Sequence, residues 1–366
     1  MNIVWFSWKD IKHPRAGGAE LISWRLMTKL ANDGHNVSLI TSQYAGASEY
    51  EVLEKVEIFR SGGRYSVYPK ARSVFKQKLK NKPDLVIDEM NTIPFGAAFY
   101  SHCPSILLTY QLARKVWFHQ MPQPVSTLGY LIEPLYLRIM AAKYPLVLTE
   151  SESTRRDLSN FGFKLNSVKV FRVGIDLAPL YSLPPKTNLK QILILGSIRP
   201  MKRTLEAIKS FEIARDKMPD LTLTVAGDDS GPYADQVKQY VANSKHSSSI
   251  NLTGRVDETK RLNLMLSASV ILVASVKEGW GLIVTEANSQ GTPAIVFDCD
   301  GLRDSVKDQQ TGLLVPPGDV MAMGKAINDL LSNQTAYQAL RQKAWEDSKQ
   351  YNFSNCYADF RKYTGV

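Results

Sequence analysis

Two carboxylates that could bind hydroxyl groups, Glu278 and Glu286, stand eight residues apart in the chain. The apolar run 270–274, which we interpret as a buried strand, precedes them, and a short helix is expected after them. The residues that build the loop between them are Gly279, Trp280, Gly281 and Leu282. A glycine loop at a helix N-terminus binds anions through its free N–H groups, and carboxylates accept hydrogen bonds from hydroxyls. A ligand with both phosphates and hydroxyls is a sugar nucleotide.

A second glycine loop follows the first apolar run of the chain, residues 2–7. Gly17 and Gly18 stand there before an expected helix, where glycine lets the backbone approach a ligand closely and the helix N-terminus favours a phosphate. An ordinary surface turn is the alternative interpretation.

A third segment places cations after the apolar run 191–195. Arg199, Lys202 and Arg203 stand at the end of this expected strand and the start of an expected helix, where cations can hold a diphosphate. Positive charge is unfavourable at a helix N-terminus, so a bound anion would resolve a local conflict. A solvated basic helix start is the alternative.

These loops need a framework, and both halves of the chain alternate short apolar runs with helical stretches, which is typical of parallel sheets covered by helices on both faces. The expected strands are 2–7, 36–40, 85–88, 105–108, 146–149, 191–195, 221–226, 250–253, 270–274 and 294–297. The expected helices are 19–33, 152–160, 202–217, 232–244, 257–267, 282–290, 320–331 and 336–350. The linker is expected at 174–189, which separates a Rossmann-like domain 1–173 from another at 174–350.

Composition excludes several classes of protein. The chain has 366 residues, of which 44% are hydrophobic and 22% charged, as in ordinary globular proteins. Its cysteines fit neither a disulfide framework nor a zinc site, which favours a reducing cytoplasm; they are Cys103, Cys299 and Cys356. Asp298 and Asp300 have the Asp-x-Asp form of a divalent-metal site, but a turn is the preferred interpretation, and no metal is predicted.

The net charge of +10 is concentrated in the first half, where residues 1–175 carry +9. Eight cations with no acid among them lie in the segment Arg60–Lys82, and they are Arg60, Arg64, Lys70, Arg72, Lys76, Lys78, Lys80 and Lys82. Either this segment is a solvated surface, or it contacts the anionic inner face of a membrane. No nucleic-acid-binding motif accompanies it. The longest apolar stretch, 128–148, is interrupted by charges and prolines, so membrane insertion is not expected.

Taken together, these motifs resemble those of the retaining glycosyltransferases of family 4. The resemblance rests above all on Glu278-Gly279-Trp280-Gly281-Leu282 followed by Glu286-Ala287, and it spans nearly the whole chain. It also includes Gly17-Gly18, Gly196–Lys202, Gly227, Gly254-Arg255, Gly291-Thr292-Pro293 and Thr311–Val315. The resemblance implies the GT-B fold, in which two Rossmann-like domains face each other across a cleft, and a last helix, 351–366, that returns to the first domain.

The resemblance also implies roles for these residues toward a UDP- or GDP-linked sugar, with no further cofactor. Glu278 would bind hydroxyls of the donor sugar, the N–H groups of residues 279–282 would meet the sugar and the diphosphate, and Glu286 would hold the ribose. Lys202 and Arg199 would stabilise the diphosphate leaving group. Gly17 and Gly18 would line the opposite wall of the cleft, and Gly254 and Arg255 would lie near the base. The acceptor would be a carbohydrate or a lipid-linked molecule.

Two positions depart from the family's usual pattern. Ser197 stands where the family usually has an arginine, and Tyr110 stands where it usually has a histidine that contacts the donor hexose. These departures support one alternative to a transferase, a non-catalytic sugar-nucleotide-binding partner. An epimerase of sugar nucleotides, which can share the same fold, is another alternative.

Overall fold

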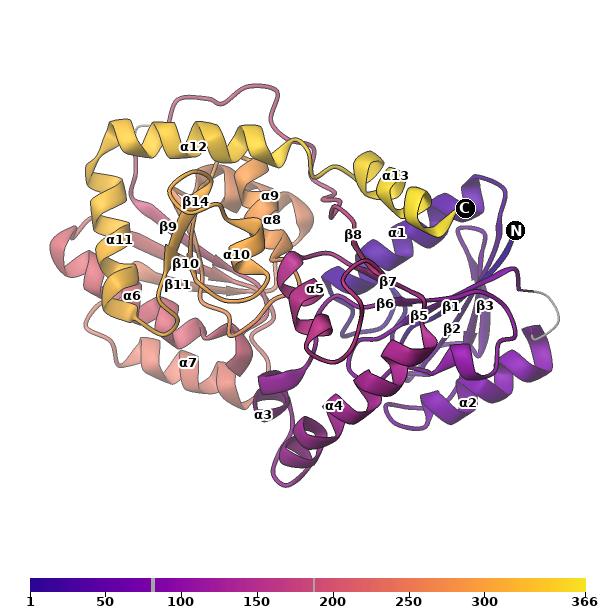
Figure 1. Ribbon diagram of the computed structural model, residues 1–366. Helices are drawn as coiled ribbons and strands as arrows, with labels where there is room; N and C mark the ends of the chain where they lie inside the picture. Colours follow the sequence, from indigo (N-terminus) through magenta and orange to yellow (C-terminus); the bar gives the residue numbers. More distant parts are fainter. Residues whose placement is uncertain (80–82, 187) are drawn as a thin grey trace. The chain divides into compact units, whose positions relative to one another are not determined.

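A computed structural model describes residues 1–79, 83–186 and 188–366 of the chain. The chain divides into two compact units, which are described here separately (Figure 1). Unit 1 comprises residues 1–117, 123–174 and 354–366, and unit 2 comprises residues 118–122 and 175–353. No helix among the described residues is both long and apolar enough to span a bilayer.

Unit 1 is built on an eight-stranded sheet of order β3-β4-β2-β1-β5-β6-β7-β8, in which only β3 runs antiparallel to its neighbour. Its strands are β1 (Asn2–Phe6), β2 (Asn36–Thr41), β3 (Tyr50–Leu53), β4 (Val56–Arg60), β5 (Leu85–Glu89), β6 (Ser105–Leu108), β7 (Leu146–Thr149) and β8 (Val168–Val170). Central β1 pairs with β2 and β5, so that its residues are buried on both faces. This is why these strands read as continuous apolar runs in the sequence.

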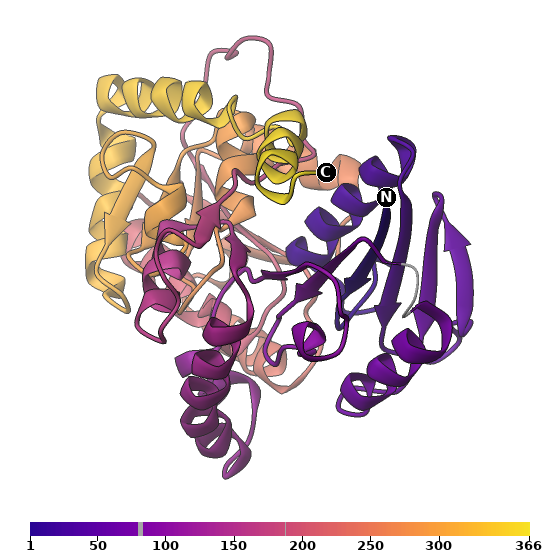
Figure 2. The same ribbon diagram turned by 45° about the vertical axis from the view of Figure 1, so that its right-hand side comes forward.

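Helices cover both faces of this sheet (Figures 1 and 2). Successive side chains of a strand point to opposite faces, so apolar side chains on both faces are buried under helices. Val4 and Phe6 of β1 pack against α2, whereas Trp5, between them, stacks on Phe360 of α13 with ring centroids 5.9 Å apart. Unit 1 contains α1 (Gly18–Asn32), α2 (Val67–Val74), α4 (Val125–Lys143), α5 (Glu152–Ser159) and α13 (Phe353–Thr364). A π-helical turn (Phe75–Leu79) and two 3₁₀ turns (Ala97–Phe99 and Arg114–Val116) complete these elements. The one-turn helix α3 (Trp117–Gln120) has its first residue in unit 1 and the others in unit 2.

Unit 2 is built on a six-stranded, all-parallel sheet of order β11-β10-β9-β12-β13-β14. Its strands are β9 (Gln191–Leu195), β10 (Thr222–Ala226), β11 (Ile250–Gly254), β12 (Val270–Val273), β13 (Ala294–Phe297) and β14 (Gly312–Val315). Its helices are α6 (Thr204–Lys217), α7 (Pro232–Ala242), α8 (Glu258–Ser267), α9 (Leu282–Ser289), α10 (Leu302–Ser305), α11 (Val320–Ser332) and α12 (Gln334–Ser348), with 3₁₀ turns at Pro200–Lys202 and Ser247–Ser249. Ile192 and Leu193 of β9 belong to different apolar cores on the two faces of the sheet.

Every expected strand is present, and every expected helix overlaps an observed one. One boundary was wrong in a way that matters for the site. The helix expected from residue 202 begins at Thr204, because Arg203 adopts a left-handed conformation with φ of +50° and interrupts it. Lys202 therefore lies in a 3₁₀ turn. The sequence interpretation also omitted β3, β4, β8, β14, α2 and α4. Of these strands, β3, β8 and β14 have only three or four residues and lie at sheet edges, whereas β4 lies between β3 and β2.

We predict that Phe360→Ala destabilises unit 1 by roughly 3–5 kcal/mol, the usual cost of truncating a buried phenylalanine. Phe360 is fully buried and contacts the rings of Trp5 and Phe171, so α13 depends on it for attachment. Denaturant unfolding measures the change. Met321→Ala, at an exposed position of α11, is the control and should change stability by less than about 0.5 kcal/mol. Equal stability of the two variants would contradict this account of α13.

Candidate functional site

The loop that follows β12 holds Glu278 in a fixed position. The Ser275 hydroxyl donates a hydrogen bond to Glu278 Oε1 over 2.6 Å, and Lys202 Nζ forms an ion pair with the same oxygen at 2.5 Å. The backbone N–H of Glu278 donates to the carbonyl oxygen of Asp300 over 3.0 Å. Lys202 and Glu278 lie 76 residues apart in the chain, and the structure brings them together at the carboxyl ends of β9 and β12.

Two glycines permit this arrangement, because a side chain at either position would collide with the backbone or with a neighbouring side chain. Gly301 has φ of +81°, and a Cβ atom there would lie 2.3 Å from the carbonyl oxygen of Glu278. Gly281 has φ of +93°, and its Cβ would lie 2.7 Å from Leu302 Cδ2. The loop after β13 can therefore lie directly against the Glu278 loop, which restricts the direction in which the carboxylate points.

The indole of Trp280 faces the interior of unit 2. Its Nε1 donates a hydrogen bond to Thr285 Oγ1 over 2.9 Å, and its ring packs on Tyr351 with centroids 5.1 Å apart. The side chain is buried, so it anchors the loop to the start of α9. Any contribution of Trp280 to ligand binding is therefore left to its backbone.

Glu286, on α9, has a partner that the sequence analysis did not identify. Arg261 of α8 binds both carboxylate oxygens, at 2.7 Å from Nη1 to Oε2 and 3.3 Å from Nη2 to Oε1. Burial raises the pKa of Glu286 above its ordinary value, and the charge and hydrogen bonds of Arg261 oppose that shift. No periodicity or motif links α8 to α9, so only the fold could reveal this pair.

The ends of β9, β10 and β11 form the basic side of the site. Arg199 and Arg255 both approach Asp228 Oδ2, with nitrogen–oxygen distances of 3.9 and 3.4 Å. Hydrogen bonds from Ser230 and Arg255 hold the pKa of Asp228 below its usual value. Both arginines are largely exposed, so these ion pairs are weak and leave the guanidinium groups accessible to an anion.

Close backbone contacts bring these three strand ends together. A Cβ atom at Gly227 would lie 2.0 Å from the carbonyl oxygen of Gly196, and the N–H of Gly227 donates to the carbonyl of Gly254 over 2.9 Å. The three glycines that the sequence places at successive strand ends are therefore neighbours, and Gly254 brings Arg255 beside them.

In unit 1, the glycine loop before α1 differs from the phosphate loop that the sequence suggests. The N–H of Gly17 donates to Glu20 Oε2 over 2.7 Å, and Lys9 Nζ pairs with Glu20 Oε1 at 2.8 Å. The buried carboxylate of Glu20 thus occupies one donor that a phosphate would use. Gly18 is the first residue of α1 and extends this loop into the helix.

Tyr110, which stands in place of the family histidine, is buried in a hydrogen-bond network. Its hydroxyl lies 2.6 Å from Ser23 Oγ, and Ser23 donates to Glu89 Oε2 over 2.7 Å. The indole N–H of Trp5 donates to the same oxygen over 2.9 Å. Tyr110 is therefore a structural residue of unit 1 in this arrangement.

Two buried carboxyl groups at strand ends of unit 1, Glu89 and Glu150, form no ion pair with a described residue. Burial, with repulsion from Glu20, raises the pKa of Glu89 to about 7, and burial, with repulsion from Glu89, raises the pKa of Glu150 to about 8. Glu150 Oε1 has no hydrogen-bond partner within the described residues. Neither residue is among the predicted site residues, although each stands at the carboxyl end of an apolar strand.

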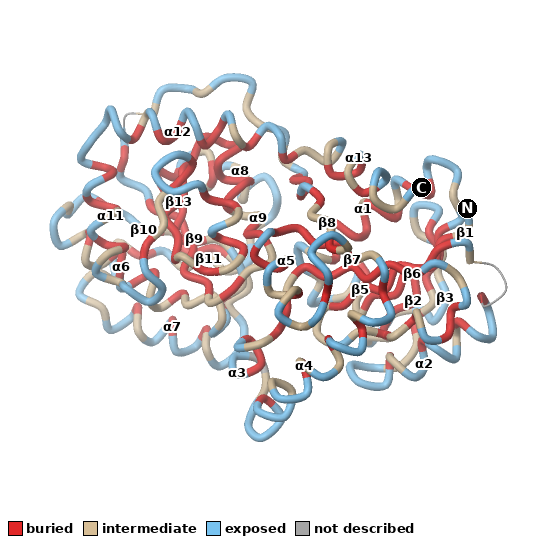
Figure 3. The backbone as a smooth tube through the Cα atoms, in the orientation of Figure 1, coloured by how far each residue is buried: buried red, intermediate tan, exposed pale blue. Residues whose placement is uncertain are grey.

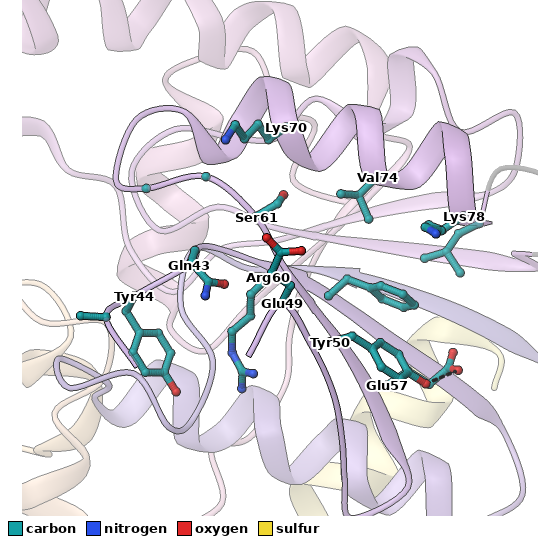
Figure 4. A pocket seen from close by; sticks show the side chains of 15 residues that line it. Gln43, Tyr44, Glu49, Tyr50, Glu57, Arg60, Ser61, Lys70, Val74 and Lys78 are labelled. Atoms are coloured by element: carbon teal, nitrogen blue, oxygen red, sulfur yellow. Dashed lines mark hydrogen bonds between the residues drawn. The ribbon is translucent and has the colours of Figure 1, made fainter. Parts of the chain in front are cut away.

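A groove of about 1000 Å³ in unit 1 lies between α2 and the strands β3 and β4 (Figure 4). Tyr50 and Glu57, joined by a 3.2 Å hydrogen bond, line one wall, and Lys70 and Lys78 line the other. Arg60, also at the groove, pairs with Asp10 at 2.6 Å and with Glu51 at 2.9 Å.

The structure thereby corrects one member of the basic segment 60–82. Arg60 is buried and neutralised by two carboxylates, so it cannot meet a membrane. Arg72 lies over the ring of Tyr100, 5.2 Å from its centroid. Lys80 and Lys82 fall outside the described residues.

Cations occupy both carboxylates of the Asp-x-Asp segment. Arg303 binds Asp298 at 2.8 Å and Asp300 at 3.1 Å, and Lys277 also pairs with Asp300 at 3.2 Å. Within the described parts of the chain, no group of three or more histidine, cysteine or acidic side chains is placed to hold a metal ion.

Both halves of the chain match family models of glycosyltransferases. Residues 16–179 match the model described as Glycosyltransferase Family 4, and residues 182–347 match the one described as Glycosyl transferases group 1. A curated relative, glycogen synthase of Mycobacterium tuberculosis, is 29% identical over an alignment that covers 95% of this chain and 91% of that protein.

Solved structures show the same fold. Sucrose-phosphate synthase of Thermosynechococcus elongatus superposes with a TM-score of 0.81 at 19% identity, over 99% of this chain and 97% of that chain. The Anabaena protein HepE in complex with UDP and glucose gives a TM-score of 0.75 at 15% identity, over 100% of this chain and 99% of that one. The GT-B class of two Rossmann-like domains, predicted from the sequence, is confirmed.

We predict that Glu150→Gln stabilises the protein at alkaline pH. The folded carboxyl has a pKa of about 8 against an ordinary value of 4.5, so between these values the folded state holds a proton that the unfolded state has lost. The free energy of unfolding of the wild type should therefore fall as pH rises from about 5 to about 8, at up to about 1.4 kcal/mol per pH unit for this group. The free energy of unfolding of the variant should not show this fall, because glutamine carries no ionisable proton.

Thermal unfolding between pH 5 and pH 9 tests this prediction. The variant's unfolding midpoint should exceed that of the wild type at pH 9 and approach it at pH 5. Glu152→Gln, at an exposed glutamate on α5, is the control and should track the wild type throughout. Parallel curves for all three proteins would refute the buried, uncharged state of Glu150.

Proposed function

We propose that this chain, a glycosyltransferase of the family 4 type with the GT-B fold, transfers a sugar from a UDP- or GDP-linked donor to an acceptor hydroxyl and retains the anomeric configuration. One observation carries the proposal: the Lys202–Glu278 ion pair at the carboxyl ends of β9 and β12, flanked by glycine loops and a second carboxylate. Parallel α/β sheets bind their ligands at that edge.

The donor would lie along the strand ends of unit 2. Glu278, positioned by Ser275, would accept hydrogen bonds from sugar hydroxyls, and the N–H groups of residues 279–282 would face the diphosphate. Glu286 would bind the ribose, since each of its oxygens retains a lone pair beside Arg261. Gly254 and Arg255 would lie near the base.

Catalysis would depend on charge stabilisation at the leaving group. Lys202 is about one-third exposed and Arg199 about one-half, so both can turn toward a diphosphate. Negative charge that develops on the departing phosphate would be stabilised by these cations, which are already in place before the reaction. The leaving phosphate would accept the proton of the attacking hydroxyl on the same face. Because Lys202 and Arg199 supply positive charge, this mechanism needs no metal.

We do not interpret the two carboxylates as a nucleophile and an acid. Hydrolases that retain configuration use two carboxyl groups about 5 Å apart on either side of one bond. Here Glu278 is held in a loop by Lys202, whereas Glu286 is held on a helix by Arg261. Each has its own cation on a different element, which supports separate recognition of the sugar and the ribose.

The relatives support the class of donor and acceptor. HepE was solved with UDP and glucose, and the curated M. tuberculosis relative is named a glycogen synthase. We propose that the acceptor, a carbohydrate or a lipid-linked sugar of polysaccharide or glycolipid biosynthesis, binds unit 1, where aromatic and charged side chains line the groove of Figure 4. The enzyme would act in the cytoplasm, at the inner face of the membrane.

We predict that Lys202→Ala and Glu278→Ala each lower kcat/KM by about a hundredfold or more, as loss of one transition-state donor does in other enzymes. A thermal-shift screen of nucleotide sugars first identifies the donor, and transfer is then followed with that donor. Lys190→Ala is the matched control, because Lys190 forms an exposed ion pair with Asp220 at 2.7 Å on the same unit. The control should keep full activity.

Turnover that survives both site substitutions would reject the proposed site. NMR of the donor incubated alone identifies an epimerase if the sugar isomerises without an acceptor. Donor binding without turnover across a panel of acceptors would instead identify a non-catalytic sugar-nucleotide-binding protein. Transfer that inverts the anomeric centre would reject the retaining mechanism only.

A further inference from the structure

Much of the helix α4 is exposed (Figure 3), and an unusual number of its exposed residues are large and apolar. Six large apolar side chains on this one helix are between 44% and 65% exposed, and we call them the α4 stripe. They are Val125, Leu128, Leu131, Ile132, Leu135 and Ile139. Isolated exposed leucines are ordinary, but a contiguous apolar patch marks a surface that meets a partner.

The spacing of the α4 stripe places its members on one face. Residues 125, 128, 132, 135 and 139 recur at intervals of three and four, which is the helical repeat. The opposite face carries Ser126, Glu133, Leu137 and Met140, all of which are buried in unit 1. The helix therefore has an inner face that attaches it to the domain and an outer face that is apolar.

The outer face also has a one-sided charge. Glu133 is the only acid of α4, and it is turned inward, where it accepts hydrogen bonds from the N–H groups of Ala113 and Arg114 and from the indole of Trp117. The exposed charged residues of α4 are Arg138 and Lys143. The outer face is therefore apolar with cations at its C-terminal half.

An exposed aromatic side chain outside α4 continues this surface. Phe99 is 47% exposed, and Lys143 Nζ lies 5.5 Å from the centroid of its ring. Phe99 thus extends the apolar surface beside the cationic end of α4.

We propose that the α4 stripe docks on the surface of an anionic lipid bilayer. Apolar side chains along one face of a helix enter the boundary between headgroups and acyl chains, and the helix lies parallel to the membrane. Arg138 and Lys143 would meet anionic headgroups, since basic residues near such a surface are attracted to it. The proposal rests on the proposed function in one respect, because such docking would bring unit 1 to a lipid-linked acceptor.

This surface differs from the basic segment 60–82 that the sequence analysis identified. In that segment Arg60 is buried in an ion-pair network, and Tyr65 is the only exposed large apolar side chain among the described residues. The α4 stripe combines both attractions. A second copy of the chain is a poorer occupant, because a twofold contact would oppose Arg138 and Lys143 to their own copies with no acid on the outer face of α4 to pair with them.

Vesicle flotation with the full chain tests the inference. The wild type should float with vesicles of phosphatidylcholine and phosphatidylglycerol, and it should float less with phosphatidylcholine alone or at high salt. The double variant Leu128→Glu/Leu135→Glu should reduce the bound fraction about tenfold, because two carboxylates would enter an apolar, anionic boundary. Leu128→Ser/Leu135→Ser, a milder change, should give an intermediate loss.

The matched control is Leu165→Glu/Met321→Glu, at two exposed apolar residues outside α4. It should float as the wild type does. Circular dichroism and donor-induced thermal shifts should be the same in all variants, since α4 belongs to unit 1 and the proposed donor loops to unit 2.

Several outcomes would overturn the inference. These are failure of the wild type to float, unchanged flotation of both stripe variants, or loss of flotation only when Lys70, Lys76 and Lys78 become alanine. A dimer of the wild type that the stripe variants convert to a monomer, without any vesicle binding, would identify a second copy as the occupant. Flotation without sugar transfer would reject the proposed function alone, and transfer without flotation would reject the docking surface alone.

Discussion

The parallel pairing of β12 with β9 and with β13 is the constraint on which the candidate site depends. Ile271 pairs with Leu193 on one side and with Ala294 on the other, so the three strands end at one edge of the sheet. The 3₁₀ turn of Lys202, the loop of Glu278 and the turn of Gly301 each follow one of these ends. Because parallel strands share their direction, segments distant in sequence must meet there.

The carboxylates of the two units differ in their ion-pair partners. In unit 2, Glu278 and Glu286 each form an ion pair, with Lys202 and with Arg261. In unit 1, Glu89 and Glu150 form no such ion pair among the described residues, and burial with repulsion from a nearby carboxylate raises both pKa values. The first arrangement suits recognition of hydroxyls beside a diphosphate. The second predicts that unit 1 loses stability at alkaline pH.

The helix α4 has one face that packs on unit 1 and another that exposes apolar side chains. Its inner face is held by Leu137, Met140 and the hydrogen bonds to Glu133, which gives the helix a defined orientation on unit 1. That orientation turns the remaining leucines and isoleucines outward. An amphipathic helix usually turns its polar face to water, so an apolar outer face needs a separate reason, which the proposed docking on lipid would supply.

The sequence by itself determined the kind and order of most elements. Buried parallel strands are continuous apolar runs, and their lengths distinguish them from helices, so the strands that carry Glu278, Gly196, Gly227 and Gly254 could be recognised. The position of Glu278 directly after a strand was also readable. Short edge strands such as β3 and β14 gave too little pattern, and α4 was apolar on both faces, which obscured its helical period.

The tertiary structure alone decided the partners. Arg261 binds Glu286, which is 25 residues away in the sequence, and Lys202 binds Glu278, which is 76 residues away. Arg60 binds Asp10, which is 50 residues away. Trp280 and Tyr110 turned inward because Thr285 and Ser23 offered hydrogen bonds there. Local patterns record whether a residue lies on a strand or in a loop. Contacts between distant segments depend on how the chain packs, because burial and ion pairing are properties of the assembled fold.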